Sequence, residues 1–253
     1  MTPRLQRATG DPACGASTDG HRAGFPEGES WLHLASGAGG PALNMAWDEA
    51  LLEGAVRLGA PVLRFYAWSV PAATFGYAQR YVEVERLTLL RPLIRRPTGG
   101  GVVPHERDWT YTLVLPPSHW WYGTPARESY QRLHAWVQAS LERIGLRTAL
   151  VPTRAVGAPT HCFVRAEQFD VLWEGVKIAG AAQRRTRGGL LIQGSVQPPP
   201  GADRRAWEQA FLEQAVLEWG VQWLTLAPDA ALRARAEALA CEKYAQPAYA
   251  QRR

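Results

Sequence analysis

Three stretches of the chain hold residue types that could carry out chemistry, and the first is a glycine-rich segment. Residues 95–101 place Arg95 and Arg96 before Pro97, Thr98 and three consecutive glycines, Gly99, Gly100 and Gly101. Glycine tolerates positive φ, so the N–H groups of such a loop can converge on a carboxylate, a phosphate or an oxyanion. A tight hairpin with solvated arginines is the other interpretation. The segment is neither a Walker A loop nor a dinucleotide-binding fingerprint.

The second stretch surrounds Lys177, which lies among small residues on an expected strand. Ala179, Gly180 and Ala181 follow it closely. Small side chains leave room for a ligand beside the backbone, and a lysine ammonium can donate hydrogen bonds to a carbonyl or carboxylate. A solvent-facing strand lysine would fit the same pattern.

The third stretch contains Cys162, fifteen residues before Lys177. A thiolate is a strong nucleophile when a nearby cation lowers its pKa, whereas a buried thiol is inert. Cys14 and Cys241 have no comparable surroundings. His161 could deprotonate Cys162, but neighbours on a strand point to opposite faces, so His105 is an equal candidate.

Composition sets the class of protein in which these residues act. The chain has 253 residues, 46% hydrophobic and 20% charged, with a formal net charge of +5. Three widely spaced cysteines predict neither a disulfide framework nor a zinc site, and hence a cytoplasmic protein with no bound metal. We expect a disordered leader over 1–28 and a single domain over 29–253. No run approaches the ~20 apolar residues of a membrane span, and no Lys/Arg run predicts nucleic-acid binding.

Periodicity and turn residues predict the elements that position the three stretches. Together they indicate an α+β fold of two layers, with helices packed on a mainly antiparallel sheet. The expected helices are 41–58, 84–90, 125–144, 203–219 and 230–240. The expected strands are 61–68, 73–77, 102–103, 110–115, 147–151, 169–173, 177–184 and 190–196.

Taken together, these motifs resemble the biotin/lipoate ligase and lipoyl/octanoyl transferase superfamily. The resemblance runs from about Leu43 to Gln197. It rests on the order and spacing of the segments 44–52, 63–68, 75–79, 95–101, 177–184 and 194–195, with a weaker match at 242–244. It implies the catalytic-domain fold of that superfamily, with acyl transfer to a lysine of an acceptor protein.

Within the superfamily, the resemblance leaves two chemistries open. Cys162 before Phe163, and the run beginning at Asp108, are similar to transferases that take octanoate from acyl carrier protein through a cysteine thioester and require no cofactor. The third glycine, Gly101, is typical of ligases that use ATP and Mg²⁺ to make an acyl-adenylate. Gln193 stands where many relatives of both kinds carry histidine. We favour the transferase, because a thioester donor suits a reactive thiol.

The resemblance also implies partners and roles. The acceptor would be a lipoyl-domain protein or a glycine-cleavage H protein, with no nucleic acid or membrane involved. Cys162 would carry the acyl group, and Lys177 with the glycine loop would stabilise the oxyanion. Arg95, Arg96, Thr98 and His105 would contact substrate, and the acyl tail would lie among side chains such as Phe75, Tyr77 and Trp173. A non-catalytic carrier of lipoyl domains or acyl groups is a third possibility.

Overall fold

The computed structural model describes residues 28–152 and 166–252. Its strands are β1 (Ser30–Gly39), β2 (Val62–Trp68), β3 (Ala72–Phe75), β4 (Leu93–Arg95), β5 (Val103–His105), β6 (Trp109–Leu115), β7 (Thr148–Leu150), β8 (Val171–Trp173), β9 (Val176–Thr186), β10 (Gly189–Val196) and β11 (Gln222–Thr225). Its helices are α1 (Pro41–Leu58), α2 (Tyr81–Leu87), η1 (Trp120–Gly123), α3 (Ala126–Arg143), α4 (Arg204–Trp219), α5 (Ala230–Leu239), η2 (Ala240–Tyr244) and α6 (Pro247–Gln251).

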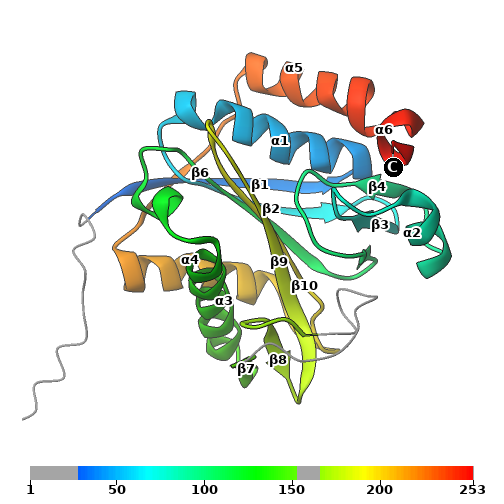
Figure 1. The fold of residues 1–253 in the computed structure, drawn as a ribbon. Coiled ribbons are helices and arrows are strands. Elements are labelled where there is room, and N and C mark those ends of the chain that lie inside the picture. Colours follow the sequence, from blue (N-terminus) through cyan, green and yellow to red (C-terminus); the bar gives the residue numbers. More distant parts are fainter. Residues whose placement is uncertain (1–27, 153–165, 253) are drawn as a thin grey trace, which may run out of the picture.

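Eight strands of the described chain form one twisted sheet in the order β11-β1-β2-β6-β10-β9-β8-β7. The pairs β11–β1 and β1–β2 are parallel, and every other pair in this sheet is antiparallel. The expected α+β fold with a mainly antiparallel sheet is therefore confirmed. Strands β9 and β10 run through the middle of the molecule in Figure 1.

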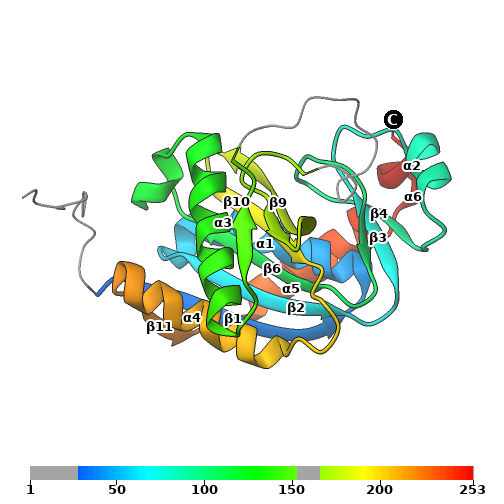
Figure 2. The same cartoon turned by 90° about the horizontal axis from the view of Figure 1, so that it is seen from below.

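Helices cover both faces of the sheet, which gives one more layer than the two expected. Helices α1 and α5 pack on one face, and α3 and α4 pack on the other (Figures 1 and 2). The reason is visible in β2, where Leu63 and Phe65 enter one apolar core while Val62 and Tyr66 enter the other. A strand that is apolar on both faces needs a helical layer on each side.

Helix α1 begins and ends at the expected residues because its boundaries carry strong local signals. Pro41 occupies the first turn, where its missing N–H costs nothing. Gly59 follows the last turn with φ of 68°, and its N–H donates to the carbonyl oxygen of Ala55. Asn44, in the first turn, donates to the carbonyl oxygens of Gly39 and Ala67 and so fastens the helix to the ends of β1 and β2.

A second, three-stranded sheet, in the order β4-β3-β5, lies beside the main one. Together with α2 and α6 it encloses a small apolar core. Figure 2 shows α2 and α6 side by side against these strands. The glycine-rich segment connects β4 to β5, so this small sheet holds the loop against the main sheet.

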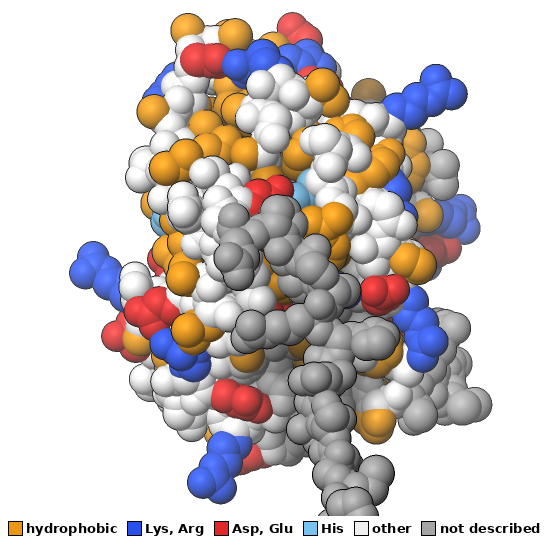
Figure 3. Space-filling view, turned by 90° about the vertical axis from the view of Figure 1, so that its left-hand side faces the viewer, with side chains coloured by type: hydrophobic (Ala, Val, Ile, Leu, Met, Phe, Trp, Pro, Cys, Tyr) orange, Lys and Arg blue, Asp and Glu red, His pale blue; other side chains and the backbone are white. Residues whose placement is uncertain are grey.

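None of the helices in residues 28–152 and 166–252 is both long and apolar enough to cross a bilayer. On the face drawn in Figure 3, the Lys and Arg side chains stand apart from one another, with Asp and Glu side chains among them.

Candidate active site

A pocket of about 500 Å³ lies between the middle of the main sheet and the glycine-rich loop. Apolar atoms make up most of its exposed wall, but half of the lining residues bring polar or charged groups to it. Such a surface suits an apolar chain with one polar group that must be oriented. The lining residues are Met45, Tyr66, Trp68, Thr74, Arg96, Gly100, Val103, His105, Thr110, Lys177, Gly180, Ala181, Ala182, Gln193, Gly194 and Ser195.

Lys177 reaches this pocket from β9 as a buried cation paired with Asp170. Its ammonium nitrogen lies 2.7 Å from Asp170 Oδ2, and the two side chains are only 7% and 0% exposed. Gly180 makes room for this arrangement, because a Cβ there would lie 3.0 Å from Lys177 Cε. The small residues after Lys177 thus allow its side chain to fold back along the strand.

Tyr130 on helix α3 and the backbone just before Asp170 supply the groups that hold this carboxylate. The hydroxyl of Tyr130 donates a short hydrogen bond to Asp170 Oδ1, and the N–H of Glu167 donates to Oδ2. The same Tyr130 oxygen accepts from the N–H of Ala181, at 3.4 Å. Burial raises the pKa of Asp170, and the ammonium of Lys177 opposes that shift. Tyr130 therefore fixes both the partner of Lys177 and the strand that walls the pocket.

His134 lies one helical turn beyond Tyr130, fully buried beside the same charges. Its ring meets the Tyr130 ring edge-on at 4.1 Å, and neither ring nitrogen has a hydrogen-bond partner among the described residues. Burial, together with the charge of Lys177, lowers the pKa of His134 to about 3. The imidazole is therefore neutral at neutral pH and must charge when the protein unfolds in acid.

This neutral histidine predicts an acid-sensitive stability. Unfolded histidine binds a proton below pH ~6.5, whereas folded His134 does so only near pH 3. Between these values the unfolded state binds more protons, so stability falls as pH falls. From pH 7.5 to 5.0 this group should remove about 2 kcal/mol from the free energy of unfolding. Urea unfolding of His134→Leu should lack that loss. If the free energy of unfolding of the variant fell with pH as steeply as that of wild type, the buried neutral state of His134 would be contradicted. The other histidines are present in both proteins, so their contributions cancel in the difference.

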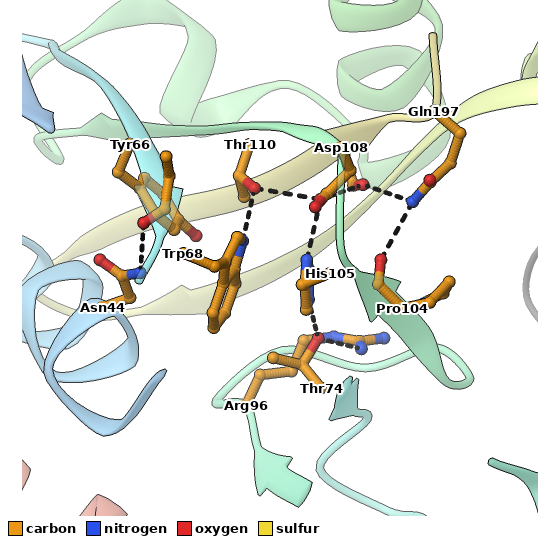
Figure 4. A network of polar contacts seen from close by, with 12 residues as sticks. Asn44, Tyr66, Trp68, Thr74, Arg96, Pro104, His105, Asp108, Thr110 and Gln197 are labelled. Carbon is orange, nitrogen blue, oxygen red and sulfur yellow. Dashed lines mark hydrogen bonds and ion pairs between the residues drawn. The ribbon is translucent and has the colours of Figure 1, made fainter. Parts of the chain in front are cut away.

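A second polar network closes the pocket at β5 and β6 (Figure 4). Asp108 Oδ2 accepts hydrogen bonds from Thr110 and Ser195 and lies 2.8 Å from His105 Nδ1. The other ring nitrogen of His105 lies 2.8 Å from Thr74 Oγ1, and the indole of Trp68 stacks on the ring at 3.9 Å. Both nitrogens of His105 are therefore engaged, which suits a fixed wall of the pocket.

The trio Ser195, His105 and Asp108 has the composition of a serine-hydrolase triad but not its geometry. A nucleophilic serine must be hydrogen-bonded to the histidine, which in turn is held by the acid. Here the hydroxyl of Ser195 and the imidazole of His105 both bond to Asp108. Nε2 of His105 faces Thr74 instead. This geometry does not support a serine nucleophile.

The glycine-rich loop is braced at each end. Arg96 donates from Nε and Nη2 to the carbonyl oxygen of Gly99, at 3.1 and 2.5 Å. A Cβ on Gly76 would lie 2.0 Å from the carbonyl oxygen of Gly100, so only glycine allows this close approach. Gly100, with φ of 87°, lines the pocket. Thr98 donates to Gln193 at 2.7 Å.

Gln193 connects the loop to a buried ion pair behind the pocket. Its amide donates to Asp48 Oδ2 at 2.7 Å, while Asp48 Oδ1 lies 2.7 Å from the guanidinium of Arg64. The hydroxyl of Tyr66 also donates to Asp48. Satisfied buried networks of this kind rigidify their surroundings. We therefore interpret Thr98 as an anchor of the loop.

The expected site residues fall into three groups by position. Arg96, Gly100, His105, Lys177, Gly180 and Ala181 line the pocket, whereas Arg95, Phe75, Tyr77, Thr98, Gly99, Gly101, Ala179 and Trp173 do not. Phe75 belongs to the small core, where it could not contact an acyl tail in this pocket, because its neighbours there are Val84 and Leu93. Cys162 lies outside the described residues, between β7 and β8 along the chain.

Sequence reasoning missed the residues that orient the others. Asp170 precedes a strand of only three residues, and Tyr130 and His134 occur in the pattern of an ordinary amphipathic helix. An acidic residue at the edge of an apolar strand is a weak signal, but it is the one that could have indicated Asp170. For Tyr130 and His134, spacing alone gives no signal, because they meet β9 only after α3 docks on the sheet.

Comparison with known proteins identifies the family to which this fold and its pocket belong. Residues 40–197 match the lipoyl protein ligase A/B catalytic domain, and the chain belongs to that family. The octanoyltransferase LipM of Moorella thermoacetica is 35% identical over 177 residues, which cover 66% of this chain and 65% of the relative. The chain therefore spans just under two thirds of the length of that relative.

Two solved structures share the fold. Protein Ta0514 from T. acidophilum, with bound lipoic acid, has a TM-score of 0.71 at 19% identity, covering 90% of this chain and 99% of that one. Lipoate-protein ligase A bound with ATP also has a TM-score of 0.71 at 19% identity, covering 89% and 98%.

Proposed function

We propose that this protein transfers an octanoyl or lipoyl group to a lysine of a lipoyl-domain protein. The observation that carries the proposal is the buried Lys177–Asp170 pair at the wall of a largely apolar pocket. Burial strengthens the interaction of the ammonium with a developing oxyanion, because little water competes for it. The relative named octanoyltransferase adds support at the level of sequence.

The proposed reaction has two steps, both at an acyl carbonyl. In the first, the thiolate of Cys162 attacks an octanoyl thioester on acyl carrier protein, and the carrier thiolate leaves with its electron pair. In the second, the ε-amine of the acceptor lysine attacks the Cys162 thioester. An amide forms, the C–S bond breaks, and a proton from the amine returns to the cysteine sulfur. A thioester donor is already activated, so neither step requires ATP.

The described residues would orient the acyl group in both steps. The chain would lie against Met45, Trp68 and Val103, and its carbonyl would point to Lys177. Gly100 belongs to the same wall, so backbone N–H groups of the loop could share the oxyanion. The acceptor would be a lipoyl-domain protein or a glycine-cleavage H protein in the cytoplasm. The reaction would take place on a single catalytic domain over residues 29–253.

ATP-dependent ligation of lipoate is the second candidate function, and the three-glycine loop beside Arg96 favours it. In that reaction, the loop would hold the phosphate of an acyl-adenylate. No cluster of three or more His, Cys, Asp or Glu side chains suited to a metal occurs in the described part of the chain. This does not argue against Mg²⁺, which is commonly held by substrate phosphates and one or two carboxylates.

One assay tests the proposal against its alternative. The purified protein would receive an apo lipoyl domain with either octanoyl carrier protein, or octanoate, ATP and Mg²⁺. Intact mass of the acceptor should increase by one octanoyl group with the carrier alone. An increase only with ATP would identify the ligase. If the mass of the acceptor did not increase with any octanoyl or lipoyl donor, with or without ATP, the protein would be a non-catalytic binding protein.

Tyr130→Phe should lower the rate of transfer about tenfold while KM for the acyl donor changes little. The variant keeps the ring, but it removes the hydrogen bond that orients Asp170 and, through it, Lys177. Loss of a hydrogen bond to a charged group costs about 1.5–3 kcal/mol. Steady-state kinetics separate kcat from KM. Tyr122→Phe is a matched control, because its hydroxyl donates to the carbonyl oxygen of Thr186, away from the pocket. An equal loss in both variants would assign Tyr130 to folding alone.

A further inference from the structure

Beside the pocket, the buried side chain of Arg95 joins two segments that are far apart in the chain. Its guanidinium donates to the carbonyl oxygens of Tyr77 and Gln79, both at 2.7 Å, and to that of Ala250 at 2.8 Å. These bonds fasten α6 to the segment that follows β3. The ring of Phe75 lies 4.7 Å from the same guanidinium. The buried arginine thus builds a rigid platform from two segments far apart in the chain.

Two further arginines meet on this platform. The guanidinium carbon of Arg252 lies 4.0 Å from the ring centre of Tyr77 and 4.6 Å from that of Tyr249. Arg184 approaches Tyr77 from β9, at 5.6 Å, and donates to the carbonyl oxygen of Pro97 at 3.4 Å. Two cations therefore share one aromatic ring, one from β9 and one from the residue that follows α6.

The charges of Arg184 and Arg252 are not neutralised by ion pairs with described carboxylates, in contrast to the nearby charge of Lys243. Lys243 lies 2.6 Å from Glu49, but no carboxylate in residues 28–152 and 166–252 forms an ion pair with Arg184 or Arg252. The hydroxyl of Tyr249 is buried and has no hydrogen-bond partner among the described groups. Burial raises the pKa of this phenol, and the positive charge of Arg252 opposes the shift. A buried donor without a partner calls for an explanation.

We propose that Arg184, Arg252 and the Tyr249 hydroxyl form a binding site for a phosphate group of the acyl donor. The proposal rests on the proposed function, which places the acyl chain and the thioester of the donor, and it adds a binding site for the phosphate of the same donor. Guanidinium groups match phosphate oxygens with paired hydrogen bonds, and a phenol O–H can supply a further donor. In an acylated carrier protein, the matching group is the phosphodiester at the base of the pantetheine arm.

The place of the site in the fold supports one continuous ligand. Strand β9 runs from Lys177 past Ala182, which lines the pocket, to Arg184. The loop that begins at Pro97 likewise leads to Gly100 in the pocket wall. Both elements connect Arg184 to the acyl pocket, and Arg252 lies over the same Tyr77 ring as Arg184. A donor could therefore place its thioester at Lys177 and its phosphate at the arginines.

Two matched donors test the site. Octanoyl-4′-phosphopantetheine and octanoyl-pantetheine differ only in the phosphate, so the ratio of their kcat/KM values reports on it. Wild type should favour the phosphorylated donor roughly tenfold to a hundredfold, as expected for hydrogen bonds to a charged group. Arg184→Gln and Arg252→Gln should each lose most of that preference, and Tyr249→Phe part of it. Arg205→Gln, an exposed arginine on α4, removes the same charge elsewhere and should keep the preference.

Binding without turnover separates this site from the proposed function. Calorimetric titration with 4′-phosphopantetheine, which carries no acyl group, should show binding to wild type and a loss in both arginine variants. An adenylate phosphate is the other source of the same chemistry. In that case, Arg184→Gln and Arg252→Gln would raise KM for ATP in the reaction with octanoate. The phosphate-binding site would then be supported, and the transferase function would be contradicted. Equal use of both octanoyl donors, with no effect of the variants on phosphopantetheine binding or on KM for ATP, would overturn the site.

Discussion

Replacing Lys177 by alanine is expected to lower acyl transfer about 10²–10³-fold, the usual effect of losing one oxyanion donor. The ammonium is buried at the pocket wall and held by Asp170 at 2.7 Å, so its position needs no rearrangement during the reaction. The loss should appear in kcat measured by mass spectrometry of the acceptor. KM for the donor should change less, because the acyl chain contacts other residues.

The control for this variant must separate chemistry from stability. Removing one partner of a buried ion pair leaves an uncompensated charge and can cost about 3–5 kcal/mol. Burial already raises the pKa of Asp170, so the lone carboxyl could instead take up a proton. The double variant Asp170→Asn with Lys177→Ala removes both charges. It should recover thermal stability but not activity. Wild-type turnover in Lys177→Ala would remove this lysine from the mechanism.

Much of the fold could be predicted because its signals are local. Helix α1 has proline in its first turn and glycine after its last, and its ends match the prediction residue for residue. Strands β9 and β10 were also predicted, because the turn between them contains Gly188 and Gly189. Strand β1 was not predicted, because its second half, Ser36–Gly39, consists of small residues typical of loops. Its pairing with β2 and β11 is long-range, as is that of β11, which was also missed.

The site was harder to predict for the same physical reason. Lys177 and the glycine loop carry their signal in neighbouring residues. The role of Asp170 depends on tertiary contacts with Lys177 and Tyr130, which the sequence does not show. Arg95 and Arg96 are adjacent and alike in sequence, yet at the end of β4 their side chains take different directions. Arg96 lines the pocket, whereas Arg95 donates to four backbone carbonyl oxygens outside it.

The second large effect concerns Cys162, which should carry a hydroxylamine-sensitive acyl group after incubation with octanoyl carrier protein and no acceptor. Cys162 precedes Asp170, the partner of Lys177, by eight residues along the chain. A neighbouring cation favours the thiolate, which is the form that attacks a thioester. Peptide mass spectrometry should locate the adduct on Cys162 and leave Cys14 and Cys241 unmodified.

Substitution gives the matching kinetic test. Cys162→Ser should lower transfer at least ~10³-fold, because a serine hydroxyl without an activating base is a far weaker nucleophile at neutral pH. Cys241→Ser is the control, since Cys241 is an exposed free thiol at the start of the turn after α5. The ligase predicts the opposite pattern, with no adduct, strict dependence on ATP and an active Cys162→Ser variant. That pattern would make Cys162 a packing residue and leave Lys177 to act on an acyl-adenylate instead of a thioester.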